Sequence, residues 1–286
     1  MNELRGMPVV KAMKEQLSQA VETLKQTGVL PKLAVVRVGA RGDDLSYERG
    51  IFKRFENVGA SVEVTALPED VSQEALEAAV TALDRDESIH GILLFRPLPR
   101  HLSEASVKQC VSLEKDVDCM RDENLARVFL GECPYPPCTP QAVMELLHHY
   151  GVDLSGKRVT IVGRSLVVGK PLSMLMLKEN ATVTICHTRT KDLKTECLRA
   201  DIVVACAGAA NLLNRTFFHN GQVIVDVGIH STNEGLCGDV CLSECDGLDI
   251  CATPVPGGVG TVTTSVLLKH VVEQAQRTAE EARRGQ

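Results

Sequence analysis

The chain has 286 residues, of which 44% are hydrophobic and 24% are charged, and its formal net charge is -6. This length suffices for two domains with separate cores, and the composition is that of an ordinary globular protein. The negative charge argues against a nucleic-acid partner, which needs a basic patch. No apolar run reaches the roughly 18 residues that cross a bilayer, so we expect no membrane partner.

The first predicted element is an amphipathic helix in the N-terminal segment MNELRGMPVVKAMKEQL. Gly28 ends its helical pattern. The segment has no continuous apolar stretch of the kind found in signal peptides, so we expect a cytoplasmic protein. One face of the helix carries Met13, Leu17, Val21 and Leu24.

Short apolar runs then alternate with helical patterns, which is typical of parallel α/β layers. The next elements that we predict, in chain order, are a strand at Leu33–Val38, a helix from about Asp44 to Asn57 that Gly59 closes, a strand through Val62 and Val64, a helix carrying Leu76, Val80 and Leu83, and a buried strand at Ile92–Phe95.

The segment PYPPCTP at Pro134–Pro140 holds four prolines, so we predict no regular structure there and a boundary between domains. Thr139 as N-cap and Pro140 as first helical residue would open a helix that runs to Tyr150, before Gly151.

The second half repeats the α/β pattern with greater regularity. It predicts a helix that opens near Gly169 and a final helix from about Thr261 to Arg283 that packs back onto the first domain. The expected strands are Val159–Val162, Thr182–Cys186, Ile202–Ala205 and Val223–Val227.

The predicted fold class is α/β with two domains. We expect an N-terminal α/β substrate domain over residues 1–138, to which the C-terminal segment 264–286 returns, and a Rossmann-type doubly wound parallel sheet over residues 139–263.

The segment Arg158–Pro171 (RVTIVGRSLVVGKP) has the layout of a dinucleotide-binding loop. A strand runs into Gly163, the polar residues Arg164 and Ser165 follow, and Gly169 opens a helix. Glycine permits a turn and a close approach of phosphate, and the amides at a helix start bind anions. The glycines are six apart rather than in the G-x-G-x-x-G spacing. A plain strand–turn–helix joint has the same pattern, but the place of this one on the first strand of a new βαβαβ series favours a dinucleotide.

The next strand ends at Cys186, His187, Thr188 and Arg189, where an NAD-specific site normally has an acidic residue for the ribose hydroxyl. Hydroxyl and basic groups at this place favour the 2′-phosphate of NADP instead. The alternative without a binding role is that His187 and Arg189 belong to a solvated loop.

The eleven cysteines are odd in number and scattered, so we expect reduced thiols. Cys237, Cys241 and Cys245 have a spacing that reaches a metal, but no His/Cys partner pair of the usual zinc pattern accompanies them. We expect no metal site.

Six motifs occur along the chain in the order in which one family has them. They are KDVD at Lys115–Asp118, the PPCTP turn, GRSLVVGKP, VIVDVGI at Val223–Ile229, GDV at Gly238–Val240 and TPVPGGVG at Thr253–Gly260. On these motifs the chain resembles the methylenetetrahydrofolate dehydrogenase/methenyltetrahydrofolate cyclohydrolase family along nearly its full length.

The resemblance implies a homodimer of two-domain α/β subunits, with a tetrahydrofolate derivative and NADP meeting in the cleft between the domains. Tyr47 looks like the tyrosine that flanks the folate ring, and Asp118 looks like the carboxylate that holds the pterin; both are catalytic candidates. Taken in isolation, these two residues would be a core aromatic and a turn residue. The further substrate-binding candidates are Phe95, Pro256, Gly257 and Gly258, and the cofactor-binding candidates are Gly163, Arg164, Ser165, Gly169, His187, Thr188, Arg189 and Ile229.

Two positions depart from the family pattern. The family has lysine four residues after the tyrosine, where this chain has Ile51, and glutamine before P-L-P, where this chain has Phe95 followed by Arg96. Oxidation of the folate methylene bridge moves a hydride and needs mainly positioning and electrostatics. Hydrolysis of the methenyl product needs general acid–base catalysis, which lysine performs and isoleucine does not.

The sequence therefore indicates a dehydrogenase with weak or absent cyclohydrolase activity. Arg54, on the same helical face as Tyr47, and Arg96 are candidate substitutes for the lysine, but arginine is a poor proton shuttle because it stays charged. Three alternatives remain open: the full bifunctional enzyme, a catalytically silent protein that binds folate or NADP, and a dehydrogenase for a non-folate substrate.

Overall fold

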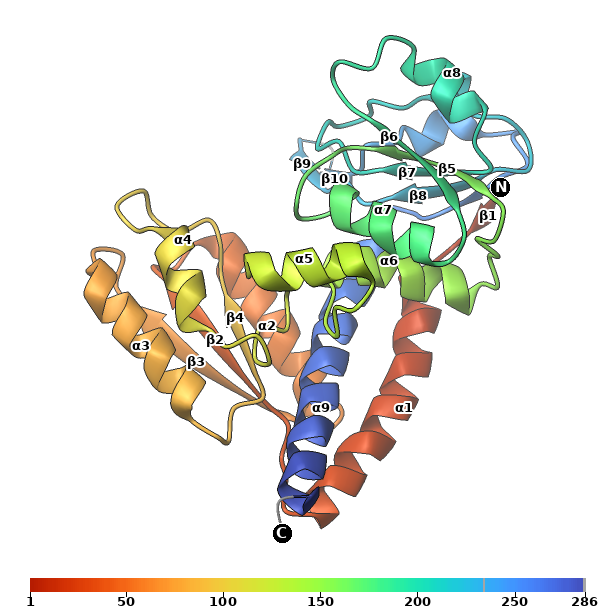
Figure 1. Cartoon of the computed structure of the whole chain (residues 1–286). Helices are drawn as coiled ribbons and strands as arrows, with labels where there is room; N and C mark the ends of the chain where they lie inside the picture. The colour runs from red at the N-terminus through yellow and green to blue at the C-terminus, as the bar shows by residue number, and fades with distance from the viewer. Residues whose placement is uncertain (234, 285–286) are drawn as a thin grey trace. The chain divides into compact units, whose positions relative to one another are not determined.

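The computed structural model describes residues 1–233 and 235–284. The chain divides into two compact units. Unit 1 comprises Met1–Lys11, Arg127–Glu132 and Pro137–Thr263, and unit 2 comprises Ala12–Ala126, Cys133–Pro136 and residues 264–284. Each unit contains its own parallel sheet (Figure 1). The predicted α/β class is confirmed. Residues 285 and 286, which the expected C-terminal segment includes, lie outside the described residues.

Unit 2 is built on a three-stranded parallel sheet in the order β3-β2-β4. The central strand β2 (Lys32–Val38) is hydrophobic on both faces and is buried along most of its length, as expected for a strand covered on both sides. Its neighbours are β3 (Ser61–Leu67) and β4 (Gly91–Leu94). The connecting helices are α2 (Gly42–Glu56) and α3 (Gln73–Arg85). These elements match the predicted order.

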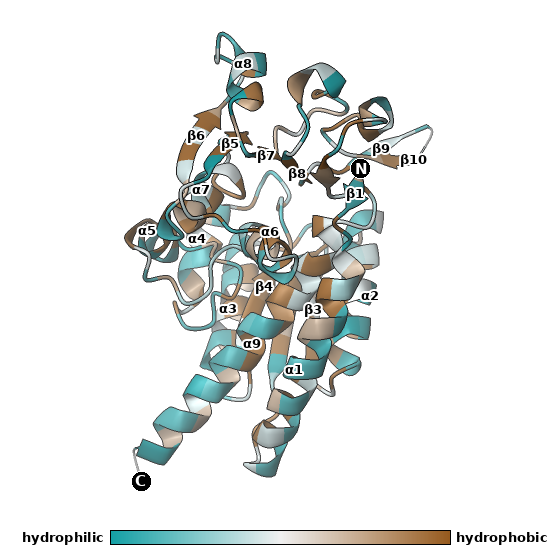
Figure 2. Cartoon of the chain, turned by 90° about the vertical axis from the view of Figure 1, so that its right-hand side faces the viewer, coloured by the Kyte–Doolittle hydropathy of each residue, from teal (hydrophilic) through white to brown (hydrophobic). Residues whose placement is uncertain are grey.

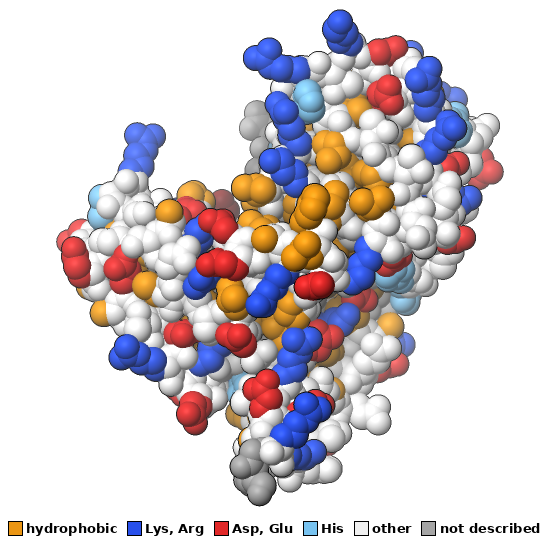
Figure 3. Space-filling view, viewed as in Figure 1, with side chains coloured by type: hydrophobic (Ala, Val, Ile, Leu, Met, Phe, Trp, Pro, Cys, Tyr) orange, Lys and Arg blue, Asp and Glu red, His pale blue; other side chains and the backbone are white. Residues whose placement is uncertain are grey.

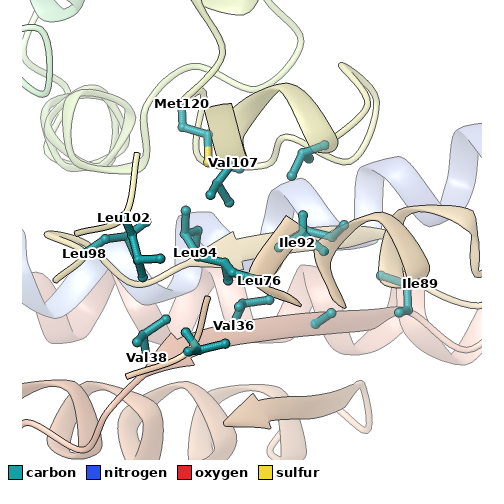
Figure 4. Close-up of a cluster of buried hydrophobic side chains, with 14 residues drawn as sticks. Val36, Val38, Leu76, Ile89, Ile92, Leu94, Leu98, Leu102, Val107 and Met120 are labelled. Carbon is teal, nitrogen blue, oxygen red and sulfur yellow. The ribbon is translucent and has the colours of Figure 1, made fainter. Parts of the chain in front are cut away.

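One face of this sheet packs on α3 and the short helix α4 (Glu104–Val107). Alternate residues of β2 point to the same face, so Ala34, Val36 and Val38 meet Leu76 and Val80 of α3 in one cluster (Figure 4). Ser72 caps α3 because its side chain accepts a hydrogen bond from the amide of Ala75 at 3.2 Å.

Unit 1 is built on a six-stranded sheet in the order β1-β11-β8-β7-β5-β6, and every pair in it is parallel. Strand β7 is buried at all four positions and appears as a hydrophobic strand in Figure 2. The strands are β1 (Asn2–Glu3), β5 (Arg158–Val162), β6 (Thr182–Cys186), β7 (Ile202–Ala205), β8 (Val223–Asp226) and β11 (Cys251–Ala252).

Helix α7 (Gly169–Lys178) connects β5 to β6, and helix α8 (Leu193–Leu198) connects β6 to β7. Counted from β5, the strand order is 2-1-3-4-5, which is the flavodoxin-like variant of the doubly wound sheet. The order reverses between β5 and β7. Ligands of such sheets bind at the carboxyl ends of the strands at this point of reversal.

The remaining elements complete the chain. They are α1 (Gly6–Gln26), α5 (Asp122–Leu130), α6 (Cys138–His149), α9 (Val259–Arg284), the antiparallel pair β9 (His230–Thr232) and β10 (Gly235–Cys237), and 3-10 turns at Lys108–Cys110, Arg215–Phe217 and Leu242–Cys245.

Two sequence predictions were wrong. Helix α6 begins at Cys138, inside the segment expected to be irregular, and its N-cap is Pro137 rather than Thr139. The amides of the first helical turn have no partner four residues earlier, so Pro140 interrupts no hydrogen bond there. The N-terminal residues also differ from the expected continuous helix, because Asn2 and Glu3 pair with Cys251 and Ala252 as the outer strand β1.

Within residues 1–233 and 235–284, none of the helices combines the length and the apolar character that a membrane crossing requires.

Candidate active site

Tyr47 lies on α2, which is fixed to the sheet of unit 2. The first turn of α2 is acidic and the last turn is basic, so both ends complement the helix dipole. The Nε atom of Arg37 on β2 donates to Oε2 of Glu48 at 2.8 Å, which ties the helix to the central strand. The neighbouring Tyr47 side chain is 38% exposed, so it lies at the surface of unit 2 on a firmly held helix.

Ile51 lies one helical turn after Tyr47 and is fully buried, at 0% exposure. Arg54 follows on the same side of α2, and burial lowers the pKa of its guanidinium. The ordinary pKa of arginine is so high that this group stays charged at neutral pH. The helix face next to Tyr47 therefore offers a hydrocarbon side chain and a permanent cation, but no amine.

Phe95 packs directly against Tyr47. Their ring centroids are 5.5 Å apart and the ring planes meet at 31°. The amide of Phe95 donates to the carbonyl of Val36 at 2.9 Å, so the residue continues the pairing of β4 with β2 and its backbone is fixed. Both positions that depart from the family pattern therefore lie beside the same tyrosine.

The segment Lys115–Asp118 has one buried and one surface carboxylate. Asp116 is buried, and burial raises the pKa of its carboxyl group. Asp118 is partly exposed, and its Oδ2 lies 3.8 Å from the guanidinium of Arg96. A surface carboxylate can accept paired N–H bonds from an aminopyrimidine ring. The buried Asp116 accepts from the amides of Met120 and Arg121 and from Nδ2 of Asn124, at 2.8, 3.0 and 2.9 Å.

A pocket of about 400 Å³ opens at the carboxyl ends of β2 and β4, next in sequence to Arg96. Apolar and proline side chains form most of its wall, which also includes one cation and one anion. It is lined by Val38, Gly39, Ala40, Arg41, Glu69, Pro97, Leu98 and Pro99.

In unit 1, Gly163 ends β5 at the point where the strand order reverses. Its φ is +141°, and a β-carbon at this position would overlap the carbonyl oxygen of Cys206, just beyond β7. A β-carbon at Gly169 would overlap the carbonyl of Gly163. Only glycines allow the first turn of α7 to approach the ends of β5 and β7 this closely.

Ser165 caps the start of α7. Its Oγ accepts from the amide of Val168 at 3.1 Å, and its carbonyl accepts from the amide of Lys170 at 3.0 Å. Because Oγ acts as an acceptor here, the hydroxyl proton is left to donate to a ligand. Arg164 is exposed beside it. Together with the helix N-terminus, this hydroxyl and this cation form an arrangement suited to phosphate.

The turn after β6 holds His187, Thr188 and Arg189. The amide of Arg189 donates to Nδ1 of His187 at 3.1 Å, so Nδ1 carries no proton in this geometry and Nε2 is the donor. The amide of His187 donates to Oγ1 of Thr190 at 2.9 Å, which shapes the turn. Thr188 and Arg189 are both exposed. Figure 3 shows several basic side chains on the visible face of unit 1.

The remaining sequence candidates line one pocket of unit 1, with a volume of about 150 Å³. Ile229, Pro256, Gly257 and Gly258 all belong to its wall, together with the first residues of α9. The Val255–Pro256 bond is cis and Gly257 has a φ of +107°, so the segment between β11 and α9 turns sharply. The structure thus brings these four candidates together.

Sequence reasoning missed two buried aspartates of unit 1, Asp226, which lines this pocket, and Asp239. Asp226 accepts from the amides of Gly228, Asp239 and Val240 at 2.9 to 3.0 Å. Burial, which outweighs these hydrogen bonds, raises the pKa of its carboxyl group to about 6. The signal was present in the VDVG and GDV motifs, but the pattern alone gives no hint that the two motifs touch.

Asp239 ties together two further segments of unit 1. Its carboxylate accepts from the amides of Ala207 and Gly208 at 2.5 and 3.1 Å and from Ala209 at 3.0 Å. Nε2 of His230 lies 2.7 Å from Oδ1 of the same carboxylate. This network fixes the loop after β7 relative to the loop after β8, and hence the shape of the pocket wall.

Among the residues described, no group of three His, Cys, Asp or Glu side chains is arranged for a metal ion. All eleven cysteines are free thiols. In the cluster that the sequence singled out, Cys245 donates to the carbonyl of Cys241, and Cys241 lies 3.5 Å from the Ser243 hydroxyl.

Two family models match this chain in sequence order. The catalytic domain of the tetrahydrofolate dehydrogenase/cyclohydrolase family matches residues 4–118, and the NAD(P)-binding domain of the same family matches residues 137–279. Tyr47 and Asp118 fall in the first match and the Gly163 loop falls in the second.

Relatives are similar in sequence to this chain over nearly its whole length. The bifunctional protein FolD of Clostridioides difficile is 49% identical over 272 residues, which cover 94% of this chain and 95% of that protein. The bifunctional FolD enzyme of Campylobacter jejuni, whose crystal structure is known, is 37% identical in sequence to this chain. Its structure matches with a TM-score of 0.93 over 97% of this chain and 99% of the other. The Trypanosoma brucei enzyme, solved with NADP and an inhibitor, is 36% identical, with a TM-score of 0.89 over 96% of each chain. The chain is therefore a member of the tetrahydrofolate dehydrogenase/cyclohydrolase family.

Proposed function

We propose that this protein is an NADP-dependent 5,10-methylenetetrahydrofolate dehydrogenase whose cyclohydrolase activity is weak or absent. Membership of the family supports the folate chemistry. The observation that carries the loss of hydrolysis is the fully buried Ile51, one turn from Tyr47 on α2. Phe95, which stands where the family has glutamine, packs on the same tyrosine.

Oxidation asks little acid–base work of the protein. NADP, when bound, supplies the acceptor for the hydride that leaves the methylene carbon. In our proposal Tyr47 packs against the flat folate ring, and Asp118 accepts N–H bonds from the pterin and so fixes its orientation. Neither role involves a proton transfer, so the substitution at position 51 leaves the step intact.

Hydrolysis of the methenyl cation requires more. A water molecule must lose a proton and a ring nitrogen must gain one, which calls for a group that exchanges protons near neutral pH. Ile51 and Phe95 have no such group. The general acid–base contribution lost in this way corresponds to roughly a hundredfold in rate or more.

The test compares both activities of the purified protein. With methylenetetrahydrofolate and NADP, we expect reduced cofactor and methenyl product to accumulate together; with methenyltetrahydrofolate, we expect hydrolysis at the buffer rate. The double variant Ile51→Lys/Phe95→Gln should raise hydrolysis by at least about tenfold. The matched control is Ile51→Met/Phe95→Gln, in which methionine is similar to lysine in length but has no amine. This control should not raise the rate of hydrolysis. Rapid hydrolysis by the unaltered protein would contradict the proposal.

The second candidate is the full bifunctional enzyme, which the names of the bacterial relatives favour. In that case Arg54 or Arg96 takes over the electrostatic part of the lysine's role. Fast hydrolysis that Arg54→Gln abolishes, with the dehydrogenase rate unchanged, would establish this alternative.

The preference for NADP rests on the turn after β6. No acidic residue lies between Cys186 and Thr190, and His187, Thr188 and Arg189 offer donors to a phosphate. We assign the 2′-phosphate to this turn and the pyrophosphate to Gly163, Arg164, Ser165 and the start of α7.

We further propose that folate recognition lies in residues 1–138 with 264–286, and cofactor binding in residues 139–263. We infer a cytoplasmic homodimer. The surface of unit 1 supports association, because Phe129 and Leu130 at the end of α5 are 74% and 66% exposed.

A further inference from the structure

A histidine on α9 holds the peptide carbonyl immediately before Asp118. Nδ1 of His270 lies 2.8 Å from the carbonyl oxygen of Val117, and the His270 side chain is buried. A carbonyl oxygen only accepts hydrogen bonds, so Nδ1 must carry the proton. The plane of the peptide that carries the amide of Asp118 is therefore fixed by a side chain far away in the sequence.

The imidazole ring is itself held in place. Tyr135 is fully buried and its ring centroid lies 5.4 Å from that of His270. The Tyr135 hydroxyl donates to Oε1 of Gln274, one turn after His270 on α9, at 2.8 Å. Arg277 stacks over the Tyr135 ring, 5.2 Å from its centroid. These contacts fix the tyrosine ring against which the His270 side chain packs.

The rest of the segment is anchored at other points. Nζ of Lys115 donates to the carbonyls of Asp84 and Asp86 at 2.5 and 2.8 Å. Asp116 is bound by the amides that follow it. Between these anchors and Cys119, whose φ is +54°, the hydrogen bond from His270 to the Val117 carbonyl holds the backbone from α9.

We propose that His270 is a positioning residue for Asp118. It does not touch the substrate; it holds the peptide plane from which the Asp118 carboxylate reaches the surface. The inference rests on the proposed role of Asp118 in binding the pterin. Without the Nδ1 donor, the buried carbonyl loses this hydrogen bond, and α9 no longer holds the peptide plane through it. A carboxylate displaced in this way recognises the pterin poorly, because bound geometry must be held closely.

Two polar variants separate positioning from general damage. The amide nitrogen of asparagine replaces Nδ1 of histidine, whereas that of glutamine replaces Nε2 and points past the carbonyl. His270→Asn should therefore keep the KM for methylenetetrahydrofolate within about twofold, and His270→Gln should raise it by about tenfold. The KM for NADP should stay within about twofold in both. A glutamine variant with an unchanged folate KM, or equal losses in both variants, would overturn the proposal.

Two further measurements keep the outcome clear. Spectra of protein with 15N-labelled histidine should show His270 in the Nδ1–H tautomer; the Nε2–H tautomer would refute the hydrogen bond. Asp118→Asn should raise the folate KM at least as much as His270→Gln. If it does not, the proposed role of Asp118 fails, and a separate effect of His270→Gln would then reflect damage to the packing around Tyr135.

Discussion

Thr188 is the residue on which the choice of cofactor can be tested most directly. It is exposed in the turn after β6, between His187 and Arg189. Thr188→Asp would place a carboxylate where we expect the 2′-phosphate, and the two negative charges would repel. We expect the ratio of kcat/KM for NADP to that for NAD to fall by at least about tenfold. The repulsion of one close pair of like charges is large enough to cause this change.

Thr188→Asn is the control for this change, because it has the same size as aspartate without the charge. Its cofactor ratio should remain close to that of the unaltered protein. If Thr188→Asp left the ratio unchanged as well, the 2′-phosphate would have to bind elsewhere.

Single residues with a local reason could be recognised from the sequence. Gly163 ends an apolar strand before a polar loop, and that alone marks a turn. The reason why no other residue fits there could not be seen, because the obstacle is the carbonyl of Cys206 beyond another strand. His270 was missed for the same reason, since its partner Val117 is distant in the chain.

At the scale of elements, the strand β8 and the loop before Val240 meet at the carboxyl group of Asp226. Its pKa is raised from 3.8 to about 6, so the native state holds this proton more tightly than the unfolded chain does. The resulting stabilisation is complete below about pH 4 and is lost as the pH rises through 6. Two pKa units correspond to about 3 kcal/mol.

The measurement is the free energy of unfolding of the protein and of Asp226→Asn, by chemical denaturation at several pH values. Asparagine does not titrate. We therefore expect the free energy of unfolding of the unaltered protein, relative to that of Asp226→Asn, to fall by up to about 3 kcal/mol from pH 4 to pH 7. A difference that is constant or moves the other way would show that the amide hydrogen bonds, rather than burial, govern this carboxyl group.

Elements with a strong period were predictable, and short ones were not. The strands β5, β6 and β7 and the helices α2, α3 and α9 stand out because apolar residues recur along each of them, at alternate or successive positions in the strands and at helical spacing in the helices. Strands β1 and β11 have two residues each, so they have no period and exist only through pairing. The start of α6 was misplaced because four prolines suggested a loop, although prolines fit the first helical turn.

At the scale of the whole molecule, association can be tested at Phe129. Phe129 and Leu130 lie beside α7, where Nζ of Lys178 donates to the carbonyl of Gly131 at 2.7 Å. Two large exposed apolar side chains on one short stretch are typical of a buried contact between proteins. We expect a mass of about 62 kDa in solution, twice the 31.0 kDa of one chain.

Phe129→Glu should shift this mass toward 31.0 kDa in light scattering, because a charge in the centre of an apolar contact is left without a partner. Met7→Glu serves as the control, since Met7 is also exposed but lies on α1. A dimer unaffected by Phe129→Glu would place the contact on another surface.

The resemblance to a family named more of the candidate site than physical pattern alone. Tyr47, Phe95 and Asp118 have no period or spacing that links them, yet Tyr47 and Phe95 are in contact and Asp118 faces Arg96, the next residue. The strand order of unit 1 was likewise not readable, because connection lengths do not determine which strands become neighbours.

Each of the two buried aspartates of unit 1 lies against a glycine of the other one's motif. A β-carbon at Gly238 would overlap the carboxylate of Asp226, and one at Gly228 would overlap that of Asp239. Each motif is thus half of an interlocking joint, so neither can evolve alone. Engineers who graft this region between relatives must transfer both halves together, and natural sequences should vary these four positions only as a set.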